Sequence, residues 1–313
     1  METVFAHQYT LAANLHVSDE DAADFLQSQF TQDLRPFAAG QCTYGLWLDV
    51  RGKVIADSFV LCEGGEEPRF RILSIGSDAA SIMRQLERHI IADDVRIDSL
   101  PEAVGIALVG SGAASFLKSL GFEGPADGHF TSSEGICIFA GRRSSGPSYE
   151  LFVESFEVAA DLRSRIEAQG VAFVESDAMQ LERIRSGIPL IPAEVGPTDL
   201  PGEGGLELDA VSFTKGCYLG QEVVARMHHV GRPQRALYVV SGVNAPPVCP
   251  SPLLNEAGKK IGELRSAYRN GDGHWTGVGL CKIRFVESGT ELRHDGILAR
   301  IERPLRVVGK DFE

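Results

Sequence analysis

Apolar residues recur at helical spacing near the start of the chain, at Ala22, Phe25, Leu26 and Phe30. Ser18 lies three residues before Asp21, which resembles a capping box with Asp in place of the usual Glu or Gln. The pattern therefore predicts a helix over residues 18 to about 34, just before Pro36.

Two runs rich in β-forming residues, 41–50 and 54–62, flank the turn at residues 51–53 and predict a β-hairpin. The further elements expected in this part are a strand over 69–75, a helix capped by Ser77 and running to about residue 91, and a strand over 95–97. The resulting order of helix, three strands, helix and strand is an α+β pattern of the split βαβ kind. It predicts a ferredoxin-like lobe over about residues 1–100.

A similar but weaker pattern follows and predicts a second α+β lobe over about residues 101–175. Its expected elements are strands over 104–109, 136–140 and 149–153, and helices over 113–120 and 156–169, with a polar connector over 142–147. Next come a helix over 176–186, a loop over 192–205 and a possible short helix over 215–228. After Pro233 the runs become short and are separated by Gly, Pro and Asn, which predicts a small all-β domain over residues 229–313.

The composition is that of an ordinary globular protein, with 43% hydrophobic and 23% charged residues, and excludes a disordered chain. The net charge of −13 argues against a uniformly basic nucleic-acid binder. Residues 1–214 hold 15 Lys or Arg against 33 Asp or Glu, whereas residues 215–313 hold 15 against 10. The two parts either differ only in surface charge, or the C-terminal part faces an anionic ligand or partner.

Six cysteines are dispersed along the chain without a CxxC pair, which indicates a reducing compartment and no disulfide framework. The first residues carry Glu2 and no basic stretch, so we expect neither a signal peptide nor a transit peptide. The longest uncharged stretch, residues 103–117, is too short to cross a bilayer. We therefore expect a cytoplasmic protein without a membrane partner.

Common catalytic motifs are missing or incomplete. The Gly110-Ser111-Gly112 turn lacks the third glycine of a dinucleotide fingerprint, and no P-loop, HExxH or GxSxG motif exists. His228 and His229 are adjacent on a predicted helix and form a poor chelate. They belong either to a solvated basic turn or to a contact with an anion or phosphate.

The segment that differs from this background is KGCYLGQE, residues 215–222. Cys217 lies two residues after Lys215 and where a helix is expected to start, and both features favour the thiolate form of a cysteine. Gly216 and Gly220 permit a tight backbone, while Gln221 and Glu222 can bond a heteroaromatic ring. The residues alone leave open whether Cys217 is a functional thiol or a buried structural one.

KGCYLGQE followed by VVAR resembles the signature of the YgfZ family, the folate-binding relatives of the glycine-cleavage T-protein. Three further segments agree with this resemblance: DAADFLQSQFTQDLRPF, the hairpin with RGKVIAD, and SGIPLIPAEV. The likeness covers most of residues 15–240.

The resemblance implies a cyclic arrangement of two α+β lobes and a small C-terminal β-barrel around a folate-sized hole. It also implies tetrahydrofolate or a one-carbon derivative as the ligand, no tightly bound metal, and a role in iron–sulfur cluster assembly or repair for enzymes such as those that thiomethylate tRNA. Carried over to this chain, Cys217 is the functional thiol, expected near the reactive end of the folate. The signature positions around it are Lys215, Tyr218, Gln221, Glu222 and Arg226, and Gly216 and Gly220 shape the loop.

Two departures from the relatives affect the expected site. Aminomethyltransferases carry a pair of aspartates after the hairpin glycine, whereas this chain has Ala56 and Asp57, so only Asp57 remains to bind a folate nitrogen. Relatives often carry an acidic residue two positions before the Gly of GIP, where this chain has Arg185. Arg185 could instead reach the glutamate tail of a folate.

The sequence thus favours a folate-binding accessory protein that contacts iron–sulfur client or assembly proteins. Because clusters usually take four ligands, Cys217 could be only a shared, transient ligand. The first alternative is a folate-dependent aminomethyltransferase. The second is a tRNA or protein interaction module that uses the basic C-terminal part.

Overall fold

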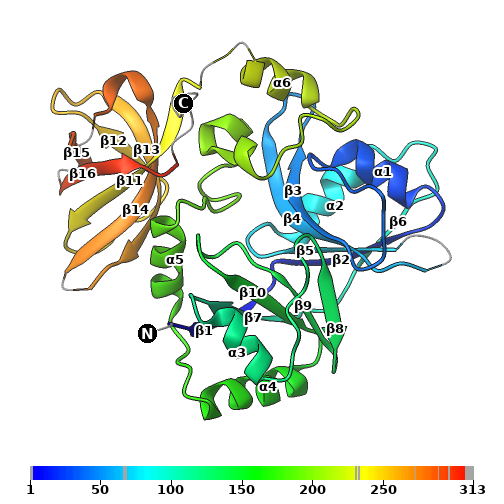
Figure 1. The fold of residues 1–313 in the computed structure, drawn as a ribbon. Helices are drawn as coiled ribbons and strands as arrows, with labels where there is room; N and C mark the ends of the chain where they lie inside the picture. Colours follow the sequence, from blue (N-terminus) through cyan, green and yellow to red (C-terminus); the bar gives the residue numbers. More distant parts are fainter. Residues whose placement is uncertain are drawn as a thin grey trace.

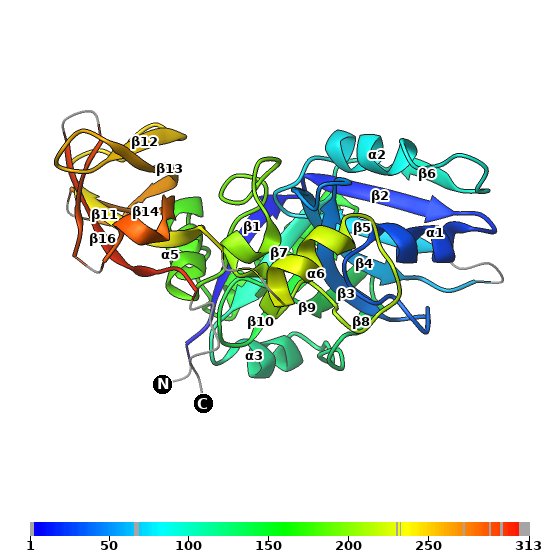
Figure 2. The same cartoon turned by 90° about the horizontal axis from the view of Figure 1, so that it is seen from above.

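The computed structural model describes residues 3–65, 69–229, 231, 233–271, 273–287, 289–294 and 297–306 of the chain. Two α+β lobes and a β-barrel make up the molecule (Figure 1). The barrel lies at one end, beside α5 (Ser176–Arg185), and the first lobe lies at the other, as the view from above also shows (Figure 2). The expected fold class is confirmed.

The first lobe is a five-stranded antiparallel sheet in the order β3-β4-β5-β2-β6. Its elements are β2 (Ala13–Ser18), α1 (Ala22–Gln29), β3 (Cys42–Leu48), β4 (Val54–Cys62), β5 (Phe70–Ser74), α2 (Ala79–Glu87) and β6 (Arg96–Ser99). Alternate residues of a strand point to opposite faces, so Leu15 and Val17 of β2 pack under the two helices while His16 faces away.

The second lobe repeats this layout in the order β1-β7-β10-β9-β8. Its elements are β1 (Phe5–Thr10), β7 (Val104–Val109), α3 (Ala113–Ser119), β8 (Phe130–Ser133), β9 (Ile136–Ala140), β10 (Ser148–Val153) and α4 (Phe156–Ala168). β1 pairs antiparallel with β7 and occupies the position that β6 has in the first lobe. The first strand of the chain therefore belongs to the second lobe.

The first predicted helix is wrong at both ends. Ser18 lies in β2, and the helix ends at Gln29 because the backbone of Phe30 is extended. The Phe30 ring packs against Trp47 with 4.7 Å between ring centroids, and the two residues form a β-bridge. Burial of this aromatic pair outweighs the helical spacing of the segment. The two strands before α1 were not predicted at all.

Three short helical segments connect the lobes to the barrel: η1 (Pro201–Gly204), η2 (Leu206–Leu208) and α6 (Gln221–His229). The helix expected over 215–228 therefore begins at Gln221 instead. The barrel is closed, in the order β11-β14-β13-β12-β15-β16. Its strands are β11 (Arg235–Val243), β12 (Ser251–Leu254), β13 (Lys260–Arg269), β14 (His274–Lys282), β15 (Glu291–His294) and β16 (Ile297–Pro304), and η3 (Ile283–Phe285) follows β14.

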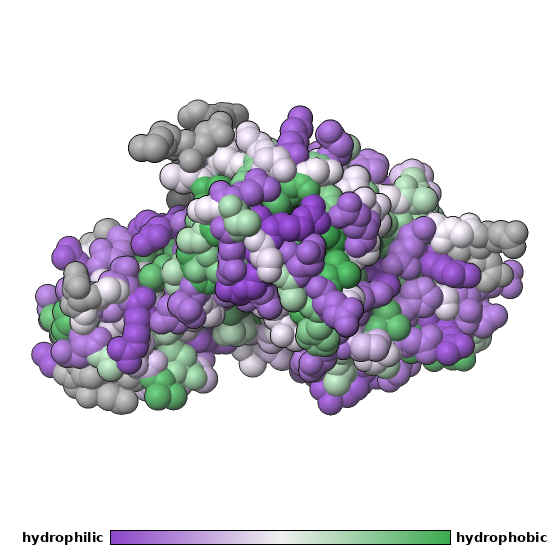
Figure 3. Space-filling model, turned by 90° about the horizontal axis from the view of Figure 1, so that it is seen from below, coloured by the Kyte–Doolittle hydropathy of each residue, from purple (hydrophilic) through white to green (hydrophobic). Residues whose placement is uncertain are grey.

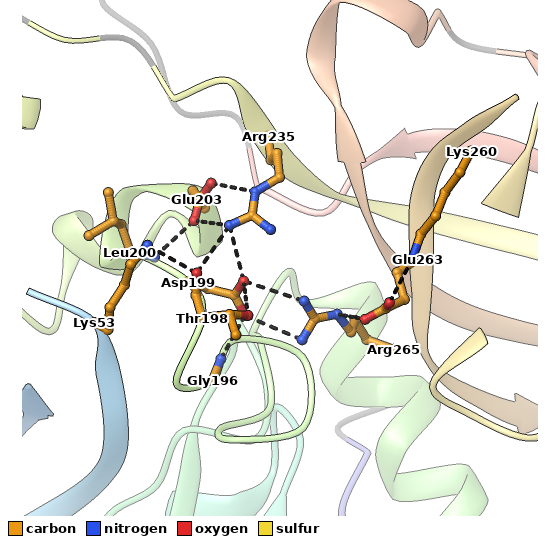
Figure 4. Close-up of polar contacts among 10 residues, drawn as sticks. All are labelled: Lys53, Gly196, Thr198, Asp199, Leu200, Glu203, Arg235, Lys260, Glu263 and Arg265. Atoms are coloured by element: carbon orange, nitrogen blue, oxygen red, sulfur yellow. Dashed lines mark hydrogen bonds and ion pairs between the residues drawn. The ribbon is translucent and has the colours of Figure 1, made fainter. Parts of the chain in front are cut away.

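The barrel joins the lobes through a buried carboxylate. An indentation in the outline separates the barrel from the lobes on the face shown in Figure 3, where hydrophilic residues cover most of the surface. Asp199 lies at this junction, fully buried, 3.1 Å from Arg235 and 3.3 Å from Arg265, both of which belong to barrel strands (Figure 4). Glu203 pairs with Arg235 at 2.7 Å, so two carboxylates hold the base of β11.

Candidate functional site

A cavity of about 440 Å³, its open mouth included, lies where the two lobes meet the segment that follows α5. Residues of β3, β4 and β5, the pair Arg142 and Arg143 after β9, and residues 183 and 188–191 line it.

Asp57 is the acidic group of the cavity. Its carboxylate accepts hydrogen bonds from the hydroxyls of Tyr44 at 2.8 Å and Ser77 at 2.7 Å, and a longer one from Ser74 at 3.3 Å. Burial raises the pKa of Asp57 above its ordinary value, although these hydroxyls act to lower it. Asp57 is therefore a carboxyl group prepared to exchange hydrogen bonds with a ligand. Ser77, which was expected to cap α2, belongs to this cluster, and Asp78 is the cap.

Arg142 forms a cationic part of the wall. Its guanidinium carbon lies 3.7 Å from the centre of the Tyr44 ring, and it pairs with Asp209 at 2.6 Å. Arg306 bonds the same carboxylate at 2.8 and 3.0 Å. Although burial acts to raise the pKa of Asp209, the two guanidinium groups hold it below its ordinary value. The guanidinium groups of Arg142 and Arg306 thus share the single carboxylate of Asp209.

Arg183 lies in the part of the cavity wall that α5 and residues 188–191 form. It binds the fully buried Glu194 in a bidentate pair of 2.9 and 2.7 Å. Glu194 also accepts a hydrogen bond from the backbone N–H of Leu190, so the pair fixes the segment over residues 188–191. The sequence analysis selected Arg185 instead. The Arg185 side chain is 65% exposed and does not line the cavity, because α5 turns the two arginines in different directions.

Lys215 of the signature anchors the loop to α1. Its ammonium group donates to the backbone carbonyls of Gln27, Phe30 and Gln32 at 2.7–2.8 Å. These carbonyls lie at and beyond the C-terminus of α1, where orphan acceptors and the helix dipole favour a cation. Burial lowers the pKa of Lys215 to about 8, so the ammonium form still predominates at neutral pH. Lys215 therefore anchors the signature loop to the end of α1.

The loop continues with a close backbone contact between two glycines. Gly220 has a φ of +80°, and a Cβ placed on it would lie 2.6 Å from the carbonyl oxygen of Asp49 and 2.9 Å from the Cα of Gly52. The signature thus packs directly on the hairpin turn at residues 51–53. Gly216 has neither a positive φ nor a close neighbour, so the expectation that it shapes the loop is wrong.

Cys217 is exposed and lies four residues before α6 begins at Gln221. The expected position at a helix N-terminus is therefore wrong. Tyr218 is buried in the same core as Tyr44, and its hydroxyl has no hydrogen-bond partner among the described residues. Burial, with a contribution from Glu207, raises the pKa of Tyr218 to about 12.

The other signature residues lie on α6. Gln221 is partly buried, and Glu222 and Arg226 are exposed. Of the described residues that line the cavity, none comes from the signature. The signature loop and the cavity wall share a hydrophobic core, which contains Tyr218 and Tyr44.

Arg142 and Arg143 were expected in a polar connector. They belong to the site because the end of β9 packs against the first lobe, where the rings of Phe139 and Phe59 lie 4.8 Å apart, and this long-range packing has no local pattern in the sequence. The pair of adjacent arginines ahead of a Ser-Gly-Pro turn was the only available signal.

Asp57→Asn is expected to change the pH dependence of stability. Since the folded state keeps the Asp57 proton to a higher pH than the unfolded state, wild-type stability falls as the pH rises from about 3.8 through the raised pKa. The melting temperature of the variant, relative to wild type, should therefore rise between pH 4 and pH 7.5. Asp78→Asn is the control, because the hydrogen bond from Ser81 lowers the pKa of Asp78, so its effect on stability changes below about pH 3.8 and should stay nearly constant over this range. A melting-temperature difference between Asp57→Asn and wild type that is equal at both pH values would refute the expectation.

The described residues were also compared with two other kinds of feature, metal sites and membrane-crossing helices. Among the described residues, no three His, Cys, Asp or Glu side chains are grouped so as to hold a metal ion. Within the same residues, no helix combines the length and the apolar character required to cross a lipid bilayer.

The architecture defines a class of protein in which two α+β lobes accompany a closed β-barrel. Residues 3–215 match the GCVT N-terminal domain, and the chain belongs to that family. A protein of Yersinia pseudotuberculosis called tRNA-modifying protein YgfZ is 27% identical over 91% of this chain and 87% of its own length. The protein of the same name from Colwellia psychrerythraea is 24% identical over 83% and 79%. The resemblance to the YgfZ family is confirmed.

A solved structure has the same fold. The glycine cleavage system aminomethyltransferase T from Bartonella henselae superimposes with a TM-score of 0.77, over 95% of this chain and 85% of its own, at 20% identity. The likeness extends through the barrel, which the family match over residues 3–215 does not include.

Proposed function

We propose that this protein binds a reduced folate in the cavity and serves iron–sulfur enzymes, tRNA-modifying enzymes among them, through the exposed Cys217. The observation that carries the proposal is the buried Asp57 carboxyl, bonded by Tyr44 and Ser77, in a cavity whose wall also holds the Arg142 guanidinium. Cofactor and thiol would then act at separate places.

The chemistry of the cavity residues fits a reduced folate. A pterin ring has N–H donors, acceptor atoms and flat apolar faces, and its p-aminobenzoyl glutamate tail is anionic. Asp57 would hold the ring N–H groups, and Arg142 would face acceptor oxygens. Phe59 and Ile75 supply apolar surface. When bound, a reduced folate supplies one-carbon chemistry.

Cys217 suits a transient contact with a partner. Its loop is exposed at the thiol but fixed at both ends, by Lys215 on α1 and by Gly220 on the hairpin turn. A single thiolate supplies one of about four ligands that a cluster needs, so the remaining ligands would come from the client protein. The relatives named tRNA-modifying proteins support clients that act on tRNA.

Complementation with Cys217→Ser tests the role of the thiol. The variant should fold with an unchanged melting temperature and bind tetrahydrofolate as wild type does, because Cys217 is exposed and outside the cavity. In a strain without this protein it should restore less than about a tenth of the iron–sulfur enzyme activity and tRNA thiomethylation. Loss of a residue that only supports a metal ligand typically costs about 10–100-fold, and loss of the ligand itself should cost at least as much.

Cys249→Ser is the matched control, since Cys249 is a partly exposed cysteine on the barrel side of the molecule. It should restore function fully. Full rescue by Cys217→Ser would refute the role of the thiol, and the absence of tetrahydrofolate binding by the wild type would refute the role of the cavity.

The aminomethyltransferase alternative keeps one supporting observation. Ala56 is fully buried in the core under the helices, because alternate residues of β4 face opposite sides. The departure at position 56 therefore leaves the cavity unchanged, and Asp57 remains available for catalysis. Formation of methylene-tetrahydrofolate from an aminomethylated lipoyl carrier would support this alternative over the accessory role.

A further inference from the structure

The cavity wall contains a buried group that the proposal above does not use, the Arg143 side chain. Arg143 is 5% exposed, and its Nε donates to Oε1 of the fully buried Glu150 at 2.8 Å. Tyr9 donates its hydroxyl to the other oxygen of Glu150 at 2.5 Å. The guanidinium carbon of Arg143 lies 4.3 Å from the centre of the Tyr9 ring. Two side chains from different strands, Glu150 and Tyr9, thus hold the guanidinium group in place.

Two glycines make room for this cluster. Gly105 is the partner of Tyr9 in the β1–β7 ladder, and a Cβ on it would lie 2.1 Å from the Tyr9 ring. A Cβ on Gly141 would lie 2.9 Å from Oε1 of Glu150. A side chain at either position would displace the cluster, so the arrangement depends on the absence of side chains at both.

One donor of this fixed guanidinium remains unused. The Nη2 atom of Arg143 is buried and has no hydrogen-bond partner among the described residues. Arginine keeps its proton at any ordinary pH, so the N–H groups cannot be removed by titration. Buried donors nearly always have a partner, and the cavity that Arg143 lines is where one can enter.

We propose that Arg143 recognises an acceptor oxygen of the cavity ligand, and that Tyr9 and Glu150 hold it for that contact. This rests on the proposed function, since the ligand is taken to be a reduced folate. The oxygen belongs either to the carbonyl of the pterin ring or to the glutamate tail. Both would form a charge-assisted hydrogen bond with a guanidinium that is already oriented.

The test measures binding of tetrahydrofolate and of tetrahydropteroate, which has the same ring but no glutamate, by titration calorimetry. Because Arg143→Met alone leaves Glu150 buried and unpaired, the variant used is Arg143→Met with Glu150→Gln. Arg143→Lys is the second variant and keeps the charge without the planar fork. Arg163→Met is the matched control, since Arg163 stacks on Phe173 at 4.1 Å and pairs with Glu167 at 2.9 Å but does not line the cavity.

The double variant should bind tetrahydrofolate about 30-fold more weakly, and Arg143→Lys about 10-fold more weakly, in the range for a lost hydrogen bond to a charged group. Arg163→Met should bind as wild type does. An equal loss for tetrahydropteroate assigns the contact to the ring carbonyl, and a loss confined to tetrahydrofolate assigns it to the glutamate tail.

Binding of tetrahydrofolate by both Arg143 variants within twofold of wild type would overturn the inference and leave the proposed function standing. If the wild type binds neither compound, the proposed function itself fails, and the inference fails with it.

Discussion

Asp199→Ala is expected to lower the free energy of unfolding by about 3–5 kcal/mol, the usual effect of removing one partner from a buried ion pair. Asp199 is fully buried, and its carboxylate faces Arg235 and Arg265 from the barrel and accepts the backbone N–H of Gly196. Without it, two guanidinium groups lose a shared counter-charge at the junction (Figure 4). Urea unfolding measures the change, and faster amide exchange should concentrate in β11 and β13.

Asp98→Asn provides the control for this measurement. Asp98 pairs with Arg96 at 2.8 Å, but both side chains are well exposed, and such surface pairs contribute about 0–1 kcal/mol. Equal losses for the two variants would show that burial at the junction adds nothing and would contradict the expected role of Asp199.

Lys215→Met is expected to lower the free energy of unfolding by about 3 kcal/mol, because three backbone carbonyls lose their donor at about 1 kcal/mol each. Methionine keeps the length of the side chain, so the loss reports the ammonium group. Since Lys215 anchors the loop that carries Cys217, hydrogen exchange over residues 212–219 should also speed up. Thermal and urea unfolding measure the first effect, and amide exchange measures the second.

Lys118→Met is the comparison for Lys215→Met. Lys118 lies in the last turn of α3 and is exposed. Its loss should change stability by less than about 0.5 kcal/mol, as for most surface substitutions. If Lys215→Met lowers the free energy of unfolding as little as Lys118→Met does, water must replace the ammonium group at the end of α1.

Much of the fold follows from local patterns in the sequence. β7 and β9 occupy the predicted ranges, and the hairpin of β3 and β4 matches within one or two residues, because apolar runs bounded by Gly and Pro specify such strands. β1 escaped prediction because only two of its six residues are fully buried. Its position is decided by pairing with β7, almost a hundred residues further along the chain.

The candidate site was less predictable than the fold. Asp57 could be found because it belongs to a hairpin with a recognisable turn. Arg142 and Arg143 reach the cavity only because the second lobe packs against the first, and the choice between Arg183 and Arg185 depends on how α5 packs. The signature led to the expectation that Cys217 lies at the start of a helix and near the folate. The structure has Cys217 on an exposed loop ahead of α6 and not among the residues that line the cavity, and residue spacing cannot show this.

The crossing of the first strand into the second lobe affects the order in which the protein can assemble during synthesis. The first lobe has all of its strands once residue 99 has left the ribosome, whereas β1 must wait until β7 has followed. All six residues of β7 are buried in the whole protein. A fragment over residues 101–175 would present β7 as an open, apolar sheet edge of the kind that promotes aggregation. β1 therefore covers that edge, and a cut between the lobes near residue 100 would separate β1 from the sheet to which it belongs.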